Sequence, residues 1–471
     1  MRILKEYIFE GRVSKEDKNS SDYKYVLFKV PKKAGILQIS YNYSKGDNVL
    51  DIGVFDSKGS FRGWSGSNKS ELFISENAAT PGYLHGKIYP GSWKIILGLY
   101  KISQEGCRYT IKVRIGGING ELQKRKIIRP FKQEYAETPK KRWFKGDLHV
   151  HTNHSDGAKS IRDLVNEAMT IGLNFVALTD HNTISQNLHV EEYESSDFLL
   201  IPAEEVTTYY GHANVWGNRK WIDFRRRSME DFQELIDEVH SQGLLFSINH
   251  PEDIDFPDGY WRFREVSRFD CIEVWHGPWS IYDYRSLIWW DSLLQKGKKI
   301  VAVGGSDFHG TDLPRLGNPT TWVYSDMLSV NNILNAIRRG HVFISRYVNG
   351  PQIYLYADAD GDGRVDSICG DEVHLSRGDK LTIYAEVKKA KDLEFKLISR
   401  GEAVKIEKVN SSHYRVAYRT QVENDGYFRA EVIRHNSQES DNAEISEVLA
   451  LTNPIYVRVK NPKNERNIDS C

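Results

Sequence analysis

Residues 146–156 read Gly-Asp-Leu-His-Val-His-Thr-Asn-His-Ser-Asp, a strand that runs into a polar loop. Alternate side chains of a strand share one face, so His149 and His151 point the same way and Val150 points the opposite way. Two imidazoles on one face at a strand end form half of a metal site. Standing alone, such a pair would more often be two surface histidines.

Other residues of metal-binding type follow later apolar runs of the chain. They are Asp180-His181, Glu204-Glu205, His212, His250, Asp307 and His309. Ten of the fifteen histidines lie between residues 149 and 309. A solvated surface rarely concentrates histidine in this way, so the pattern favours one shared metal site.

Residues 143–347 alternate strand-like and helical runs. Ser160, with Asp163 three residues later, predicts a helix start, and Gly172 ends that helix before the strand at residues 175–178. Helical spacing over 232–239 and about 287–296 precedes strands at 244–248 and 300–303, and a last helix is expected over 330–339. Each unit places metal-type residues after its strand. The alternation predicts a parallel, distorted (β/α)7 barrel with its chemistry at the carboxyl ends of the strands.

The two flanks of this region have a different pattern. Residues 1–135 contain short alternating runs (25–30, 36–43, 49–55, 93–100 and 109–115) separated by turn residues, which predicts a β-sandwich accessory domain for packing or carbohydrate binding. A polar stretch over about 121–142 predicts a linker. Residues 350–471 predict a second β-sandwich-like domain. The expected fold class is therefore multidomain, α/β plus all-β.

The composition limits the classes of partner. The formal net charge is zero, so no long-range field that attracts nucleic acid is expected. The four cysteines form no CxxC pair, which argues against a structural zinc ribbon and fits a reducing compartment. The first residues lack an apolar signal core, and no run of eighteen apolar residues predicts a membrane span. We expect a cytoplasmic protein that acts on a small-molecule or glycan-linked anionic substrate. The sequence does not indicate an oligomeric state.

The types of ligand limit the metal. Imidazoles and carboxylates without thiolates suit zinc, manganese or iron. A catalytic metal keeps a position open for water and rarely takes more than four protein ligands, so nine candidates imply two or three divalent ions with a bridging carboxylate. A separate Asp/Gly-rich stretch resembles a calcium loop, or is a simple turn, with Asp358, Asp360, Asp362 and Asp366 as oxygen ligands but Cys369 at the position of the final Glu.

Together these motifs resemble the polymerase-and-histidinol-phosphatase (PHP) family of the amidohydrolase-like superfamily. The matching pieces are Asp147-Leu-His-Val-His-Thr, Ser155-Asp-Gly, Leu178-Thr-Asp-His-Asn, Glu205 with Gly211-His-Ala-Asn-Val-Trp-Gly, Asn249-His-Pro and Ser306-Asp-Phe-His. They cover about residues 143–347. The resemblance implies a distorted β/α barrel and metal-dependent phosphoester hydrolysis, and it is strongest to the branch that includes carbaryl hydrolases.

The resemblance also implies a ligand set. A first ion would be bound by His149, His151, Glu205 and Asp307, a second by Glu205, His212 and His250, and a third by Asp156, His181 and His309. Glu204 competes with Glu205, because Pro202-Ala203 stands where the family has Pro-Gly.

Two further residues are candidates for a catalytic role. Asp180 can orient its neighbour, and His276 ends another strand, where substrate contact and packing are both open. His154 is interpreted as loop surface or a substrate contact. The expected enzyme is a phosphoesterase. The alternatives are a carboxyl-ester or carbamate hydrolase with the same metals, and a non-catalytic metal-binding module.

Overall fold

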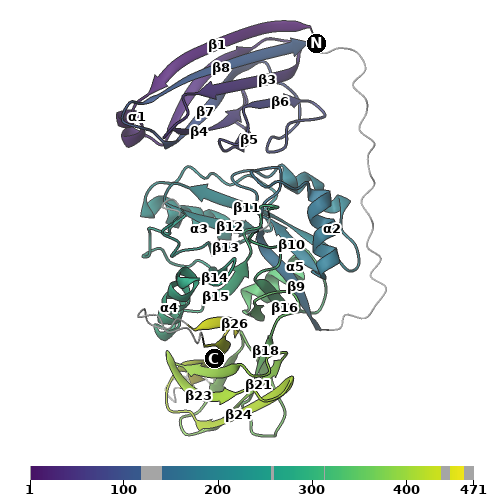
Figure 1. Ribbon diagram of the computed structural model, residues 1–471, viewed down its shortest axis with the longest axis vertical. Coiled ribbons are helices and arrows are strands. Elements are labelled where there is room, and N and C mark those ends of the chain that lie inside the picture. The colour runs from purple at the N-terminus through teal and green to yellow at the C-terminus, as the bar shows by residue number, and fades with distance from the viewer. Residues whose placement is uncertain (1, 118–140, 256–258, 312, 436–445, 461–471) are drawn as a thin grey trace, which may run out of the picture.

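The computed structural model describes residues 2–117, 141–255, 259–311, 313–435 and 446–460, and these residues are predominantly β. Three parts follow one another along the long axis (Figure 1): N-terminal sheets, a middle part that carries most of the helices, and C-terminal strands. Residues 121–140 of the predicted linker lie outside the described residues. Within the described ranges, none of the helices combines the length and apolar character needed to span a membrane.

The N-terminal part consists of two four-stranded antiparallel sheets, β1-β8-β3-β6 and β2-β7-β4-β5. Alternate residues of β8 are buried, and side chains from both sheets join one hydrophobic core. Strands over 3–13, 61–65 and 71–75 had not been expected. The elements are β1 (Ile3–Val13), α1 (Lys15–Ser20), β2 (Tyr23–Val30), β3 (Ala34–Tyr43), β4 (Val49–Phe55), β5 (Phe61–Ser65), β6 (Glu71–Ser75), β7 (Gly91–Lys101) and β8 (Cys107–Gly117).

The middle part alternates strands and helices. Ser160 caps α2 through the Asp163 backbone N–H, and Gly172 ends it in the left-handed conformation. The elements are β9 (Arg142–Val150), α2 (Ile161–Ile171), β10 (Phe175–Leu178), the 3-10 helix η1 (Gln186–Glu192), β11 (Leu199–Thr208), β12 (Gly211–Trp216), α3 (Met229–Ser241), β13 (Leu245–Ile248), β14 (Cys271–His276), α4 (Ile281–Gln295), β15 (Val301–Gly305), β16 (Thr320–Ser325), α5 (Val330–Arg338) and β17 (Val342–Ser345).

The strand order is β15-β14-β13-β12-β11-β10-β9-β16-β17. β10 pairs in parallel with β9 and β11, and β14 pairs in parallel with β13 and β15. The prediction of a wholly parallel order is wrong at β12 and β16, which pair antiparallel. Only Tyr209-Tyr210 separate β11 from β12, too short a connection for the crossover that parallel strands need. A parallel bridge between Val150, the last residue of β9, and Phe308, which follows β15, brings β9 next to the first strand of this order.

The C-terminal strands extend the same sheet. After β17 the order continues through β26, β25, β22 and β23, while β19-β18-β21-β24 form a separate sheet. The central sheet therefore continues across the domain boundary predicted at residues 347–350. The elements are β18 (Gln352–Asp358), β19 (Ser367–Ile368), β20 (Glu372–Leu375), β21 (Lys380–Lys388), β22 (Glu394–Ser399), β23 (Glu402–Lys408), β24 (His413–Gln421), β25 (Gly426–Arg434), β26 (Glu447–Thr452) and β27 (Ile455–Val459).

Buried aromatic residues join the N-terminal sheets to the middle part. Phe61 stacks on Trp221 with ring centroids 4.1 Å apart, and Trp64 packs edge-on against Phe224. Phe61, Trp64 and Phe224 belong to the hydrophobic cluster that also contains the middle strands, and the partly buried Trp221 packs against it. The N-terminal sheets are therefore fixed against the part of the chain that carries the predicted ligands.

Candidate metal centre

His149 and His151 lie at the end of β9 with fully buried side chains that face the same way. Val150 points opposite, into an apolar cluster with Leu164 and Leu178. This is the arrangement expected from strand alternation.

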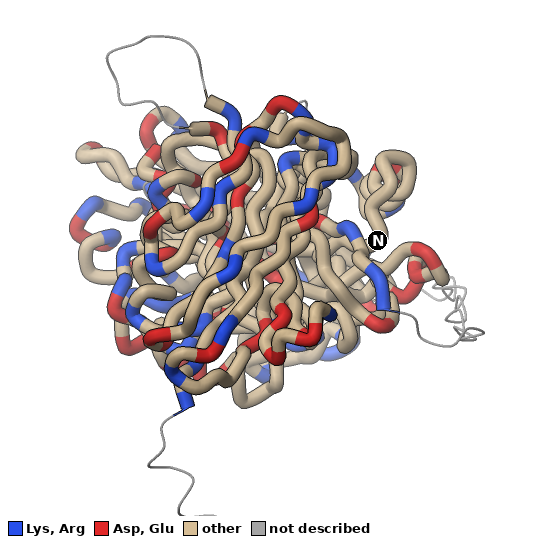
Figure 2. Tube along the Cα trace, turned by 90° about the horizontal axis from the view of Figure 1, so that it is seen from below, with Lys and Arg blue, Asp and Glu red and all other residues tan. Residues whose placement is uncertain are grey.

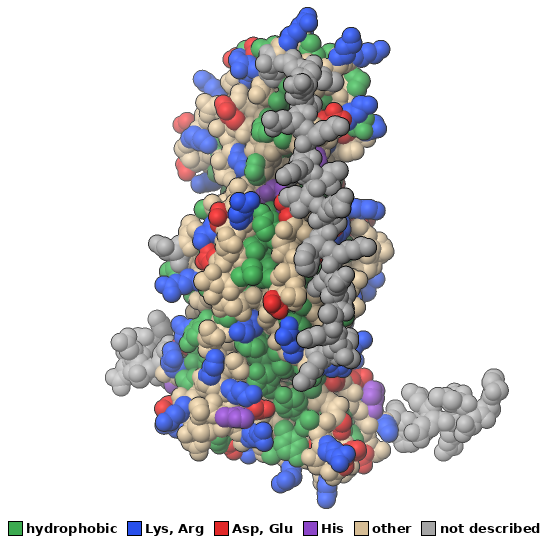
Figure 3. All heavy atoms as spheres, turned by 90° about the vertical axis from the view of Figure 1, so that its right-hand side faces the viewer, with side chains coloured by type: hydrophobic (Ala, Val, Ile, Leu, Met, Phe, Trp, Pro, Cys, Tyr) green, Lys and Arg blue, Asp and Glu red, His purple; other side chains and the backbone are tan. Residues whose placement is uncertain are grey.

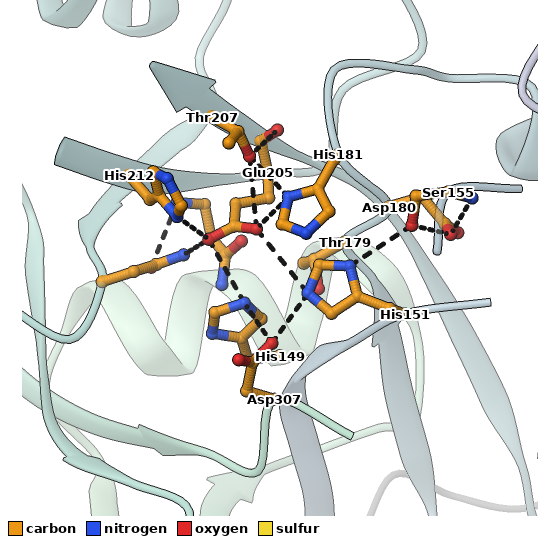
Figure 4. Close-up of polar contacts among 12 residues, drawn as sticks. His149, His151, Ser155, Thr179, Asp180, His181, Glu205, Thr207, His212 and Asp307 are labelled. Atoms are coloured by element: carbon orange, nitrogen blue, oxygen red, sulfur yellow. Dashed lines mark hydrogen bonds and ion pairs between the residues drawn. The ribbon is translucent and has the colours of Figure 1, made fainter. Parts of the chain in front are cut away.

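The other predicted ligands follow the neighbouring strands. Asp180 and His181 come after β10, Glu205 lies in β11, His212 in β12, His250 after β13, and Asp307 and His309 after β15. The side chains of His149, His151, His181, His212 and Asp307 converge on Glu205 (Figure 4). His250 and Asp307 adopt positive φ angles of 26° and 53°. Such conformations cost about 1–3 kcal/mol each and cluster at functional sites.

The Glu205 carboxylate is at the centre of the cluster. Its Oε1 lies 3.3 Å from His149 Nε2, 3.3 Å from His212 Nδ1 and 3.5 Å from His250 Nε2. Its Oε2 lies 2.6 Å from His181 Nδ1 and 3.6 Å from His151 Nε2. Each oxygen faces a different set of imidazoles, as a carboxylate that bridges two ions must.

Glu204 is oriented away from this cluster. Its buried carboxylate accepts hydrogen bonds from Asn218 Nδ2 at 3.1 Å and from the Ile222 backbone N–H at 3.1 Å. Successive residues of β11 face opposite sides, so only Glu205 can share the imidazole cluster.

Asp307 and Asp156 extend the cluster on either side of His151. Asp307 Oδ1 lies 2.8 Å from His151 Nε2 and 3.3 Å from His149 Nε2. Asp156 Oδ1 lies 3.3 Å from His309 Nε2, 3.6 Å from His181 Nε2 and 4.0 Å from His151 Nδ1.

The donor atoms fit divalent cations. Several groups of three or four residues have ligand atoms within 4.8 Å of one another, and they include every predicted ligand except His212. In the described part of the chain, four buried atoms that face the cluster have no hydrogen-bond partner: His149 Nε2, His151 Nε2, His212 Nδ1 and Asp307 Oδ1. Leaving buried polar atoms unpaired is costly, and a bound cation would satisfy them together.

Charge on the imidazoles depends on their distance from the carboxylates. Burial opposes protonation of His181, but Asp156 and Glu205 raise its pKa to about 10. Burial also opposes protonation of His309, yet Asp156 and Asp307 raise its pKa to about 9. Burial, reinforced by these two neighbouring rings, lowers the pKa of His151 to about 4. Without metal, the cluster therefore holds protons that a metal must displace.

Glu273 was not assigned a role from the sequence, although it contacts two of the histidines. It is buried in β14, its Oε1 lies 2.9 Å from His149 Nδ1, and its Oε2 accepts the His250 backbone N–H at 2.9 Å. A carboxylate on the far nitrogen of a ligand histidine fixes the tautomer that presents the other nitrogen to a metal. The only available signal was an acidic residue inside an apolar strand.

Asn249 and Thr207 were also missed. Asn249 Nδ2 donates to Glu205 Oε1 at 2.9 Å, and Thr207 Oγ1 lies 2.6 Å from His181 Nδ1. Asn249 thus orients the Glu205 carboxylate, and Thr207 orients the His181 ring.

The two predicted catalytic residues occupy different places. Asp180 is buried away from the cluster and accepts hydrogen bonds from the Thr152 and Ser155 backbone N–H groups at 2.8 and 2.9 Å and from both hydroxyls. It orders the loop that carries Asp156, whereas the sequence suggested that it orients its neighbour. His276 lies at the rim, with Nε2 3.2 Å from Asp307 Oδ2. Burial opposes its protonation, but Asp307 and Glu273 raise its pKa to about 9.

His154 is not a surface residue. Its side chain is buried, and Nδ1 lies 2.7 Å from Ser185 Oγ. Packing against the N-terminal sheets explains its burial.

The predicted calcium loop brings three of its four acidic residues together. Asp358, Asp360 and Asp366 have oxygens within 4.8 Å of one another, while the Asp362 carboxylate accepts the Arg364 backbone N–H at 2.7 Å. Cys369 is buried. Calcium binding here stays a prediction.

Comparison with known proteins supports the resemblance noted above. The PHP domain model matches residues 147–248, so the resemblance to the PHP family is confirmed over that segment. The resemblance to the carbaryl hydrolase branch stays a prediction. Among curated proteins, the chain is 32% identical over 113 residues to the 5′-3′ exoribonuclease Rnm of Salmonella typhimurium, and 40% identical over 62 residues to the DNA polymerase/3′-5′ exonuclease PolX of Bacillus subtilis.

These similarities are local. The first match covers 23% of this chain and 30% of the relative, and the second covers 13% and 10%. A two-domain protein from Bacteroides vulgatus, with a predicted PHP-like metal-dependent phosphoesterase, is 18% identical over 66% of this chain and 95% of its own, with a TM-score of 0.38. A putative metal-dependent phosphoesterase from Bifidobacterium adolescentis is 18% identical over 36% of this chain and 90% of its own, with a TM-score of 0.28.

Proposed function

We propose that this chain, which contains a PHP domain, is a metal-dependent hydrolase whose substrate is a phosphoester. The observation that carries the proposal is the buried cluster around Glu205, in which imidazole and carboxylate atoms from separate strands converge and four buried atoms lack hydrogen-bond partners among the described residues. A structural zinc site would need four ligands. This cluster offers more than twice that number from seven loops and strands, as a site for several ions would.

The proposed ligand sets follow the resemblance to the PHP family, and the observed groupings support the first and the third set. His149, His151 and Asp307 would hold one ion, and His212 and His250 a second, with Glu205 between them. Asp156, His181 and His309, beside His151, would hold a third. Manganese, zinc and iron suit these nitrogen and oxygen donors. When bound, two or three such ions would supply positive charge and lower the pKa of water.

The surrounding side chains orient the proposed ligands. The Glu273 carboxylate accepts the Nδ1–H of His149 and so leaves Nε2 free to act as a ligand. Asn249 donates to Glu205 and fixes the position of the bridging carboxylate. His276 lies at the rim, with Nε2 3.2 Å from Asp307 Oδ2, and we assign it the role of proton donor to the leaving group.

Charge favours a phosphoester over a neutral ester. Basic and acidic residues are interspersed over the molecule (Figure 2), and the formal net charge is zero, so attraction of an anion must come from the site itself. Two or three divalent ions in one cluster would provide that attraction and stabilise the charge that develops on phosphoryl oxygens. The curated relatives with local similarity are named nucleases, enzymes that cleave phosphodiesters.

The proposed scaffold is a distorted (β/α)7 barrel over residues 143–347, between β-sandwich-like domains at 1–135 and 350–471. The parallel pairs on both sides of β12 and the bridge between Val150 and Phe308 support closure of the strand order. The antiparallel β12 would be the distortion.

Parallel kinetics test the proposal. The full chain, freed of metal and reloaded with manganese, zinc or iron, is compared on nitrophenyl phosphate, bis-nitrophenyl phosphate and nitrophenyl acetate. We expect kcat/KM to be higher for a phosphoester, and Asp156→Ala to lower phosphoester turnover more than acetate turnover. Faster acetate hydrolysis that survives Asp156→Ala would instead support a carboxyl-ester or carbamate hydrolase. Absence of turnover on all three with metal bound would support a binding module.

A further inference from the structure

Two loops of the N-terminal sheets reach the loop that carries Asp156. They are residues 66–70, between β5 and β6, and residues 80–84, between β6 and β7. Histidine side chains are visible where the N-terminal sheets meet the middle part (Figure 3). The contacts of Asn68 and Lys69 with Ser155 span more than 80 residues, a separation that local sequence patterns do not reveal.

The first loop places two donors on one carbonyl. Asn68 Nδ2 donates to the Ser155 backbone oxygen at 2.6 Å, and the Lys69 ammonium donates to the same oxygen. Asp156 is the next residue. The Lys69 side chain is half-buried, and burial lowers its pKa, although Asp180 and Asp156 oppose this shift.

The second loop contacts residues 183–185, which follow β10, and Ser185 in turn contacts His154 in the loop that carries Asp156. The Gly82 backbone N–H donates to Ser185 Oγ at 3.0 Å, and Thr183 Oγ1 donates to the Gly82 carbonyl at 2.9 Å. Gly82 has a φ of +97°, and a Cβ there would lie 2.7 Å from the His154 carbonyl oxygen. This approach is therefore open only to glycine.

Asp156 depends on such support more than the other proposed ligands do. Its side chain is 41% exposed, whereas that of His309 is 27% exposed and those of Glu205 and His151 are almost fully buried. Within the described residues its carboxylate contacts histidines of the cluster alone. Its position is therefore set by the backbone around Ser155.

We infer that Lys69 is a positioning residue of the metal centre, which fixes the loop at Ser155 and so places the Asp156 carboxylate for the third ion. The inference rests on the metal centre of the proposed function. It makes the N-terminal sheets part of the site, although they contribute no ligand. Loss of the Lys69 contact should weaken one ion and leave the ions at Glu205 in place.

Calorimetric titration of metal-free full-length protein with Mn²⁺ or Zn²⁺ alone tests this inference. Lys69→Met keeps the length of the side chain and removes the donor. Loss of a group that hydrogen-bonds a ligand typically weakens metal binding about 10- to 100-fold. Lys69 contacts the backbone of the residue before the ligand, so we expect a loss at the lower end, about 10-fold, for one ion only. Lys69→Arg retains a donor and should restore the affinity. Lys94→Met, at an exposed position of β7, is the matched control and should bind as wild type does.

Two further variants make the test specific. Asn68→Ala removes the second donor to the Ser155 carbonyl from an exposed position, and it should weaken the same ion. Lys69→Met should add nothing to Asp156→Ala, because both act on one ion. Wild-type affinities in both Lys69→Met and Asn68→Ala would overturn the inference, as would an equal loss for every ion. Failure of wild type itself to bind ions would overturn the proposed metal centre instead.

Discussion

Replacing Glu273 by Gln exchanges one carboxylate oxygen for an NH₂ group and should weaken metal binding through His149, which Glu273 contacts. The two Glu273 oxygens accept from His149 Nδ1 and from the His250 backbone N–H, each at 2.9 Å. The backbone N–H can only donate, so the amide oxygen of the glutamine must accept from it. The amide NH₂ then faces His149 Nδ1, which must become an acceptor. The proton of His149 moves to Nε2, the atom that points toward Glu205.

The expected loss follows from this change of tautomer. A ligand nitrogen that carries a proton must release it or rotate before it binds a cation. Changes of this kind typically weaken metal binding about 10- to 100-fold, which is ~1.4–2.8 kcal/mol. The glutamine fills the same buried volume, so we expect little loss of folding stability beyond the charge-assisted hydrogen bond, about 1.5–3 kcal/mol.

Competition with a chromogenic chelator measures the affinity. The matched control is Glu204→Gln, the same substitution at a buried residue whose carboxylate contacts Asn218 and Ile222, away from the cluster. Burial raises the pKa of Glu204 well above its usual range, so a neutral amide is a mild change there. Equal metal affinity in Glu273→Gln and wild type would refute the reasoning, and so would an equal loss in Glu204→Gln.

Three more predictions concern the site and the fold. His149→Ala should abolish turnover, whereas His154→Ala should lower kcat/KM only mildly, because His154 packs outside the cluster; equal losses would contradict the ligand assignment. Metal binding at pH 7 should release about three protons, because, against the opposing effect of burial, neighbouring carboxylates raise the pKa of His149 well above its usual range and those of His181 and His309 to about 10 and about 9. Affinity should therefore rise with pH from 7 toward 9 and fall in acid; calorimetry in two buffers counts the protons, and none released would argue against these ligands. Asp291→Ala removes the α4 carboxylate that pairs with the buried Arg429 guanidinium of β25, and it should lower the free energy of unfolding in urea by about 3–5 kcal/mol; a loss below about 1 kcal/mol would contradict this.

Most candidate ligands could be located from sequence because they lie in or just after apolar runs, whereas their grouping into ligand sets came from the resemblance to the PHP family. Strand alternation orients His149 and His151, and loops after neighbouring strands meet at one edge. The same rule decides between Glu204 and Glu205 once the strand is in place. Local signals also predicted the start of α2 at Ser160 and its end at Gly172.

Long-range contacts could not be predicted in this way. Glu273 resembles any acidic residue in a strand until its distance to His149 is known. The contact between Lys69 and Ser155 joins parts of the chain assigned to separate domains. The reversal at β12 and the continuation of the central sheet into the C-terminal strands depend on pairing choices that no single segment encodes.

Anomalous diffraction from crystals grown with Mn²⁺ would test most directly the claim that this cluster is the metal centre. We expect two or three peaks among the side chains around Glu205, with one next to Asp156. Absence of any peak at the cluster, or peaks confined to the loop at Asp358–Asp366, would contradict it.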